Sequence, residues 1–219
     1  FNLDFKEIYS IFIFGIFLTP NAISSALISI SDRLVINYYY SESSVAIYSV
    51  AYLISMVVIL FSESIAKAWS PWIFEKISLN SKKNNVLIVK YIYLFVIVIT
   101  ILAASVWYLS PFLINLMTNS AYLEAAEFVI YIVFGLVFNS FYTMIFPISV
   151  FLKKTKKLSI LNMICALLNI ILNIILVPKI GPKGAAISTF IVFFLKFLLT
   201  FIYTNVIYPL PWLFFLKSK

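Results

Sequence analysis

The sequence predicts an all-α integral membrane protein, built as a six-helix transmembrane bundle. Of its 219 residues, 63% are hydrophobic and 11% are charged, with a mean hydropathy of +1.08, whereas a soluble domain is close to half apolar and a quarter charged. A helix needs about 20 apolar residues to cross the hydrocarbon core, so the chain has room for about six. Its apolar runs lack the period-two alternation of a membrane-spanning strand, which leaves helices as the spanning elements.

Six apolar stretches separated by short polar segments are the predicted spans. The polar segment from Glu75 to Leu87 is the longest of them, so no soluble domain fits, and residues 1–219 are predicted to be a single transmembrane lobe. Neither a basic segment nor a cleavage site precedes the first apolar run, so we predict no signal peptide and expect the chain to be part of a longer protein. The spans are predicted at about 9–39, 44–69, 88–117, 126–152, 158–178 and 185–208.

Basic residues predict the orientation of the bundle, because Lys and Arg near the ends of spans stay on the cytoplasmic side. When alternate ends are assigned to opposite sides, Lys179 and Lys183 fall on one side, and Arg33 and Lys196 fall inside spans. All other basic residues share the side of the two termini, which we therefore predict to be cytoplasmic. They are Lys6, Lys67, Lys76, Lys82, Lys83, Lys90, Lys153, Lys154, Lys156, Lys157, Lys217 and Lys219.

The residue types on which enzymes and metal sites depend are scarce in this sequence. The chain has no His and a single Cys, Cys165, which argues against His-based catalysis, structural zinc, haem and disulfides. We therefore predict no catalytic residue, no metal and no cofactor, and a protein that is not an enzyme. The net charge of +8 does not indicate nucleic acid, because cytoplasmic lysines face anionic membrane lipids, which are the expected partners.

Polar residues inside a span are costly unless they face protein or water, so they indicate functional positions. In the first span, Ser25, Ser29 and Asp32 are spaced by four and then three residues and share one helix face, which we expect to point inward. Arg33 lies beside them, in the outer third of the bilayer. It either joins this polar face or extends to the outer interface, as long basic side chains often do.

Lys196 is the deepest basic residue in the predicted bundle. It lies eleven residues after Ala185, or about 16 Å along the helix, close to the midplane of a core about 30 Å thick. A lysine there costs about 2.5–3.5 kcal/mol in lipid. We therefore expect Lys196 to face a hydrated interior.

A stripe of small and polar residues follows one face of the fifth predicted span. Ser159, Asn162, Ala166, Asn169 and Asn173 are spaced by three, four, three and four residues, which places them on one side of a helix. Packing between helices explains such a stripe, and contact with a substrate is the alternative.

Two further polar pairs have i and i+4 spacing. Asn139 and Thr143 in the fourth span are interpreted like the stripe, as packing or substrate contacts. Glu63 and Lys67, near the cytoplasmic end of the second span, favour an ion pair on the helix surface.

A known family has similar residues in a similar order. The run NIILNIILVPKIGPKGAAIST, residues 169–189, resembles the signature near the end of bacterial polysaccharide repeat-unit flippases, which belong to the multidrug, oligosaccharidyl-lipid and polysaccharide exporter superfamily. Asp32-Arg33, the segment Tyr48–Ala51, Pro71 and the lysine-rich turn Lys153–Lys157 resemble it as well. In the run itself, Pro178 is expected to stop one helix, and Gly181 and Gly184 to allow a tight turn into the next.

The resemblance implies the C-terminal half of a transporter with two lobes and about twelve helices, whose N-terminal lobe is absent from this chain. It implies alternating access around a central cavity and an oligosaccharide cargo on a polyprenyl pyrophosphate. That cargo would move from the cytoplasmic to the outer leaflet of the bacterial inner membrane, for O-antigen, lipopolysaccharide or capsule synthesis. The N-terminal lobe and other polysaccharide-assembly proteins are the implied protein partners. The predicted substrate-binding residues are Lys196, Arg33, Asp32, Asn169 and Asn173.

Three other functions remain open, and one of them is a scaffold lobe that transports nothing. A drug exporter of the same superfamily would need a deep carboxylate for a cationic cargo, and the sequence offers Asp32 and Glu63. A membrane-embedded enzyme of polysaccharide assembly would need acid and base groups beside an accessible cavity, and a substantial polar loop. The sequence favours the flippase over the drug exporter and the enzyme.

Overall fold

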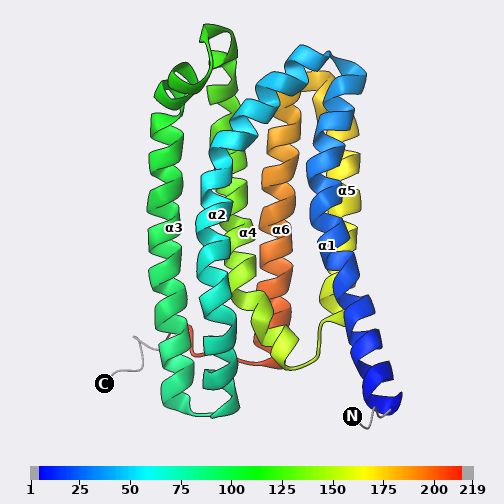
Figure 1. The fold of residues 1–219 in the computed structure, drawn as a ribbon, viewed down its shortest axis with the longest axis vertical. Helices are drawn as coiled ribbons and strands as arrows, with labels where there is room; N and C mark the ends of the chain where they lie inside the picture. Colours follow the sequence, from blue (N-terminus) through cyan, green and yellow to red (C-terminus); the bar gives the residue numbers. More distant parts are fainter. Residues whose placement is uncertain (1–4, 214–219) are drawn as a thin grey trace.

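The fold is an all-helical bundle of six long helices and one short one (Figure 1). A computed structural model describes the backbone of residues 5–213, and the side chains of 5–14, 16–18, 20–22 and 120 lie outside the described part. This confirms the predicted fold class. The elements are α1 (Phe5–Tyr39), α2 (Glu42–Ser78), α3 (Lys82–Met117), the 3₁₀ helix η1 (Ser120–Ala125), α4 (Ala126–Phe151), α5 (Lys156–Ile180) and α6 (Pro182–Ile207).

Within the described residues, five helices, α2 to α6, are long and apolar enough to cross a membrane. The prediction of a first span over 9–39 is confirmed as a helix, but many of its side chains lie outside the described part. A crossing by α1 therefore stays a prediction.

The predicted end of α2 and the predicted start of α3 are wrong by several residues, and the predicted end of α5 is wrong by two. α2 continues through Pro71 to Ser78, and α3 begins at Lys82, so most of the predicted loop from Glu75 to Leu87 is helical. α5 likewise continues through Pro178 and ends before Gly181, whose φ of +70° suits glycine. Proline removes one backbone hydrogen bond, and a membrane helix packed on its neighbours tolerates that loss.

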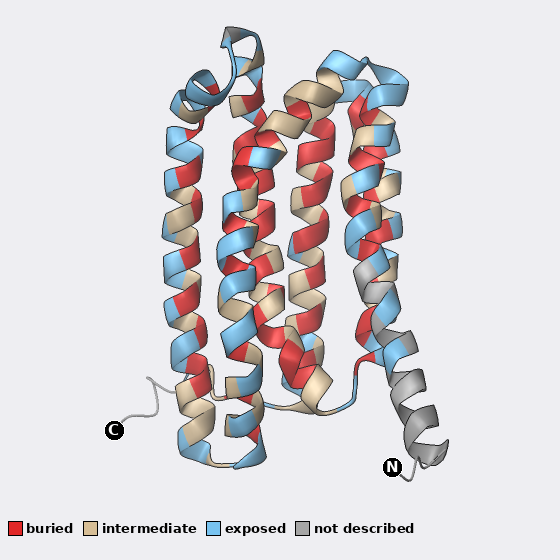
Figure 2. Cartoon of the chain, in the orientation of Figure 1, coloured by how far each residue is buried: buried red, intermediate tan, exposed pale blue. Residues whose placement is uncertain are grey.

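The core lies where the helices pack around α4 and α6 (Figure 2), because buried side chains concentrate on these two helices and on the faces turned toward them. α1 packs along α5, and α2 packs on α4. α1 and α2 meet near their connecting turn and diverge toward the opposite end of the bundle (Figure 1).

The connections gather at two opposite ends. At one end the hydroxyl of Tyr40 lies 3.6 Å from the position of a Cβ added to Gly181, so the α1–α2 and α5–α6 turns are neighbours. At the other end the rings of Phe74 and Phe151 are 5.6 Å apart, and Tyr208 donates to Asn85 over 2.8 Å. This grouping agrees with the one used to count basic residues on each side.

Candidate functional site

A buried carboxylate, Asp32, joins four helices near the end of the bundle that holds the α1–α2 turn. Its side chain is 0% exposed. Oδ2 accepts hydrogen bonds from the hydroxyls of Tyr48 (2.6 Å) and Thr189 (2.7 Å), and Oδ1 accepts one from Nδ2 of Asn173 (2.7 Å). Because α1, α2, α5 and α6 each supply one of these residues, the carboxylate links four helices.

Asn169 and Asn173 extend this network along α5. Asn173 donates to Oδ1 of Asn169 over 3.2 Å, and Ser31 of α1 donates to the same atom over 2.7 Å. Ser188 of α6 donates to Oδ1 of Asn173. Both asparagines are 0% exposed. In this conformation they contact helices rather than a cavity, which favours packing as the explanation of the stripe on α5.

The Asp32 network, defined as Asp32, Tyr48, Asn169, Asn173, Ser188 and Thr189, is satisfied internally. No buried side-chain nitrogen or oxygen among the described residues lacks a hydrogen-bond partner. The described residues also contain no group of three or more His, Cys, Asp or Glu side chains that could hold a metal ion. Carboxylate, amide and hydroxyl oxygens suit a hard cation, but here the oxygens of Asp32 are already occupied by donors.

The predicted inward face of α1 is only partly confirmed. Asp32 is buried and Ser29 is half-buried, but Ser25 is exposed. Ser24 and Ser31 are the buried serines of this segment instead. At this level of α1, the buried face therefore includes Ser24 instead of the predicted Ser25.

Arg33 has the opposite environment from Asp32, although the two are adjacent in sequence. It is half-buried and borders a pocket of about 310 Å³ with Ser49, Tyr52 and Met56 of α2. Nη1 donates to the hydroxyl and the carbonyl of Ser29 (2.8 Å each), and Nε donates to Ser49 over 3.3 Å.

The remaining nitrogen of Arg33, Nη2, has no hydrogen-bond partner among the described residues. Cζ of Arg33 lies 5.1 Å from the centre of the Tyr52 ring. The guanidinium is thus oriented by its neighbours while keeping free donors, which is the arrangement of a binding site for an anion.

Lys196 of α6 lies inside the lobe, and it is 3% exposed. Nζ donates to Oδ1 of Asn139 over 3.2 Å and lies 4.0 Å from the centre of the Tyr142 ring. Tyr142 in turn accepts from Nδ2 of Asn162 over 3.0 Å. The expectation that Lys196 points away from lipid is met, but the expected hydrated surroundings are not, because Tyr142 and Asn139 cover the ammonium group. Its role in binding stays a prediction.

Glu63 and Lys67 lie deeper than the sequence indicated, because α2 extends to Ser78. Phe74 packs on Phe151, the last residue of α4, and Glu63 precedes Phe74 by eleven residues, or about 16 Å of helix. Both charged residues are exposed. No ion pair forms between them within 4.0 Å, so the predicted surface pair is wrong.

Sequence reasoning named three members of the Asp32 network as binding residues and missed the others. Tyr48 and Thr189 were noticed as parts of a family signature, without any contact to Asp32. Ser188 and Thr189 interrupt an apolar run, which is a detectable signal. Tyr142, which covers Lys196, offers none, because a tyrosine in a span is ordinary.

Comparisons with known proteins bear on the family and the fold of this chain. Residues 11–175 match the MatE family. A solved structure of a MOP superfamily transporter from Pyrococcus furiosus is similar, with a TM-score of 0.72 and 17% identity, covering 93% of this chain and 44% of that one. That transporter is described as having a binding pocket of reverse polarity that suggests a different function. No curated protein matches the chain.

The family match covers more than half of the chain, and the structural match shows the same fold over nearly all of it. The chain spans less than half the length of the similar transporter. Polar groups packed between apolar helices are what the interior of a membrane-spanning bundle requires. The chain therefore belongs to the MatE family.

Proposed function

We propose that this chain is one lobe of a flippase, the C-terminal half of a transporter with about twelve helices. It moves oligosaccharide units linked to polyprenyl pyrophosphate from the cytoplasmic to the outer leaflet of the bacterial inner membrane. The moved units serve O-antigen, lipopolysaccharide or capsule synthesis. The missing lobe and other polysaccharide-assembly proteins are its partners, and both ends of this chain face the cytoplasm.

The observation that supports this proposal is the contrast in charge between Asp32 and Arg33. The carboxylate of Asp32 is buried and accepts three hydrogen bonds, so it is closed to a cationic cargo. The guanidinium of Arg33 borders an open pocket and keeps free donors. Arginine binds phosphate with two parallel hydrogen bonds, which suits the pyrophosphate of a lipid-linked glycan.

The same face of α2 continues toward the cytoplasm with charged residues. Ser49, Met56 and Glu63 are seven residues apart and share one side of the helix. Lys67 follows one turn later. An exposed charge about 16 Å along the helix from Phe74, which packs on the last residue of α4, is costly in lipid, and this favours water on this face. We therefore extend the proposed cargo path from Arg33 to Lys67.

Membrane voltage favours the same direction of transport. Each negative charge that leaves a cell with a negative interior gains about 2.3 kcal/mol per 100 mV. A diphosphate head group moved outward is thus driven by its own charge, and the lobe needs no chemical step.

Export of a cationic drug is the second candidate, and Glu63 is the observation that favours it. Its exposed carboxylate lies deep enough to attract a cation from the cytoplasm. The similar transporter from Pyrococcus furiosus, with its reversed pocket polarity, supports the idea that pocket charge separates functions among related folds. The two candidates therefore make opposite predictions for Arg33 and Glu63.

The deciding experiment replaces Arg33 in the full-length transporter, in a strain that depends on it. Arg33→Gln is expected to lower surface polysaccharide at least tenfold at unchanged protein level, and Arg33→Lys to retain part of the export, because Lys keeps the charge but not the two-pronged geometry. Lys83→Gln, in the exposed α2–α3 turn, is the matched control and should export normally. Normal export by Arg33→Gln, together with loss of drug resistance in Glu63→Gln, would replace the flippase by the drug exporter.

A further inference from the structure

An apolar groove lies between α2 and α3, on a different face of α2 from the Arg33 pocket. It has a volume of about 620 Å³, and Met144 of α4 forms part of its floor. Trp69 and Trp72 line one wall, and Tyr91 and Leu94 line the other. The groove belongs to neither the Asp32 network nor the proposed cargo path.

In the orientation proposed above, the groove lies in the inner leaflet. Trp72 lies two residues before Phe74, which packs on the last residue of α4. Ser64 lines the opposite end, and eight residues of helix separate it from Trp72, or about 12 Å. The groove thus begins at the interface and runs into the hydrocarbon core, as a lipid acyl chain does.

The aromatic end of the groove is fixed by contacts. Nε1 of Trp69 donates to the carbonyl of Met144 over 2.8 Å. The Trp69 and Trp72 rings stack with centres 5.0 Å apart, and Tyr91 meets Trp72 edge-on at 5.2 Å. Aromatic rings at this level are typical of the membrane interface, and their mutual contacts preform the groove before anything enters it.

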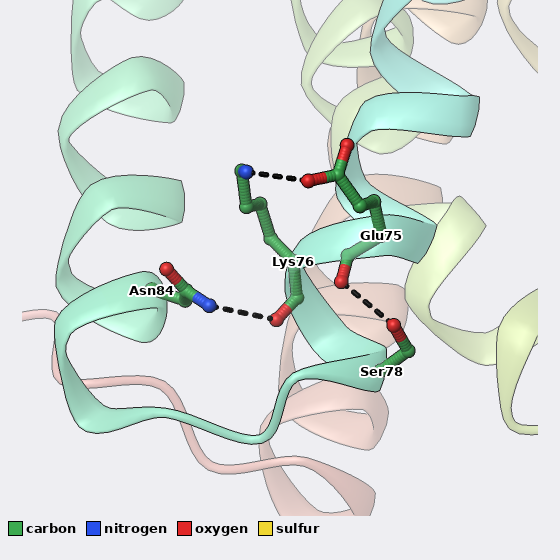
Figure 3. Close-up of polar contacts among 4 residues, drawn as sticks. All are labelled: Glu75, Lys76, Ser78 and Asn84. Carbon is green, nitrogen blue, oxygen red and sulfur yellow. Dashed lines mark hydrogen bonds and ion pairs between the residues drawn. The ribbon is translucent and has the colours of Figure 1, made fainter.

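Lys76 lies beside this aromatic end, and further lysines follow on the α2–α3 hairpin. Nζ of Lys76 lies 5.9 Å from the centre of the Trp72 ring, and exposed Lys90 precedes Tyr91 on α3. Figure 3 shows the polar contacts that hold the α2–α3 turn: Asn84 donates to the carbonyl of Lys76 over 3.5 Å, and Lys76 pairs with Glu75 over 2.7 Å. With Lys82 and Lys83 in the first turn of α3, this end of the hairpin has four lysines and one acid.

We propose that the α2–α3 groove binds a phospholipid with a negatively charged head group. One acyl chain lies against Trp69, Trp72 and Leu94, and the phosphate lies beside Lys76 and Lys90. A neighbouring helix fits the space less well, because a helix about 10–12 Å wide needs more than this volume over a length of about 12 Å. Charge selects the lipid class, since juxtamembrane lysines favour anionic lipids.

The test uses the tryptophans of the groove as reporters. In full-length protein with Trp107 and Trp212 replaced by Phe, and any tryptophan outside this chain replaced likewise, Trp69 and Trp72 remain as emitters. The protein is reconstituted in phosphatidylcholine vesicles with increasing fractions of dibrominated phosphatidylglycerol, or of dibrominated phosphatidylcholine. Quenching by phosphatidylglycerol should saturate at a several-fold lower fraction than quenching by phosphatidylcholine.

Two variants and their two controls test this result further. Ala68→Phe, which fills the groove, should abolish the preference, while Ile97→Phe on the exposed side of α3 should keep it. Replacing both Lys76 and Lys90 by Gln should reduce the preference by about fivefold for each lysine, and Lys154→Gln in the other turn should not. Equal quenching by both lipids, an unchanged preference in Ala68→Phe, or a co-purified polyprenyl phosphate that phosphatidylglycerol does not displace would each overturn the proposal.

Discussion

Asp32 and Lys196 are two charges buried in the same lobe, and their surroundings differ completely. Asp32 accepts three hydrogen bonds from three different helices. Lys196 donates to one amide oxygen and otherwise faces the rings of Tyr142 and Phe193, at 4.0 and 5.9 Å from their centres. The carboxylate is thus built into the contacts between helices, whereas the ammonium group lies in an aromatic setting that does not depend on it.

This difference indicates which of the two buried charges contributes to folding. Removing Asp32 takes one acceptor from each of three buried donors, Tyr48, Asn173 and Thr189, and each lost hydrogen bond costs free energy. Removing the charge of Lys196 leaves two rings that need no partner, and takes the donor from a single acceptor on half-buried Asn139. Asp32 and Lys196 both lie inside predicted spans, so their positions in the helices do not separate their roles. The hydrogen-bond partners of each charged group decide whether it stabilises the fold or serves another purpose.

The largest effect is expected from Asp32→Leu, the change that attacks the network directly. The free energy of unfolding should fall by about 3 kcal/mol, because Tyr48, Asn173 and Thr189 each lose an acceptor in a buried site. Thermal unfolding of the detergent-solubilised protein measures this. Leu34→Ala, one helical position beyond Arg33 and 64% exposed, is the control. If Asp32→Leu unfolded at the temperature of the parent, the carboxylate would not hold the helices together.

A smaller loss is expected from Gly184→Ala, which separates α5 and α6, the two helices that supply four of the six network residues. A Cβ on Gly184 would lie 2.6 Å from the carbonyl carbon of Leu176 and 2.8 Å from the nitrogen of Val177. Backbone cannot yield as a side chain does, so α6 must move from α5, at a cost of about 1–3 kcal/mol. The same thermal unfolding measurement applies.

Gly15→Ala is the matched control for this change, since a Cβ on Gly15 meets nothing within 4 Å. In a helix interior this replacement should be neutral or should raise stability by up to about 1 kcal/mol. Equal stability losses at the two glycines would show that the close approach of α5 and α6 is not what Gly184 supplies.

The fold could be predicted from the sequence because membrane-spanning helices leave a long, simple signal. The buried stripe on α5, Ser159 to Asn173, followed from spacing alone. Helix ends were less predictable, since Pro71 and Pro178 look like stops but lie inside helices whose neighbours compensate for the lost hydrogen bond. That error placed Glu63 near the membrane interface, although the longer α2 puts it far from the cytoplasmic end of the helix.

The candidate site was only half predictable for a related reason. Spacing within one helix shows which polar residues share a face, but not which residue on another helix they meet. Asp32 and Thr189 are separated by most of the chain, and their contact depends on how α1 and α6 pack. Whether Lys196 is open to water depends likewise on the position of one ring, Tyr142.

The smallest change in stability is expected from Lys196→Met, which tests the other half of the comparison. Methionine has a similar length and fills the space against Tyr142 and Phe193 without a charge. The protein loses one hydrogen bond and a cation–π contact, each about 1 kcal/mol, and no longer pays for burying the ammonium group. The free energy of unfolding should therefore stay within about 1 kcal/mol of the parent, measured by thermal unfolding.

Export is expected to fall sharply in the full-length transporter if a conformational change uncovers Lys196 to the anionic cargo, and Lys196→Arg should retain more export than Lys196→Gln. A loss of stability as large as that of Asp32→Leu would make Lys196 a second structural charge, and normal export by Lys196→Met would remove it from the cargo path.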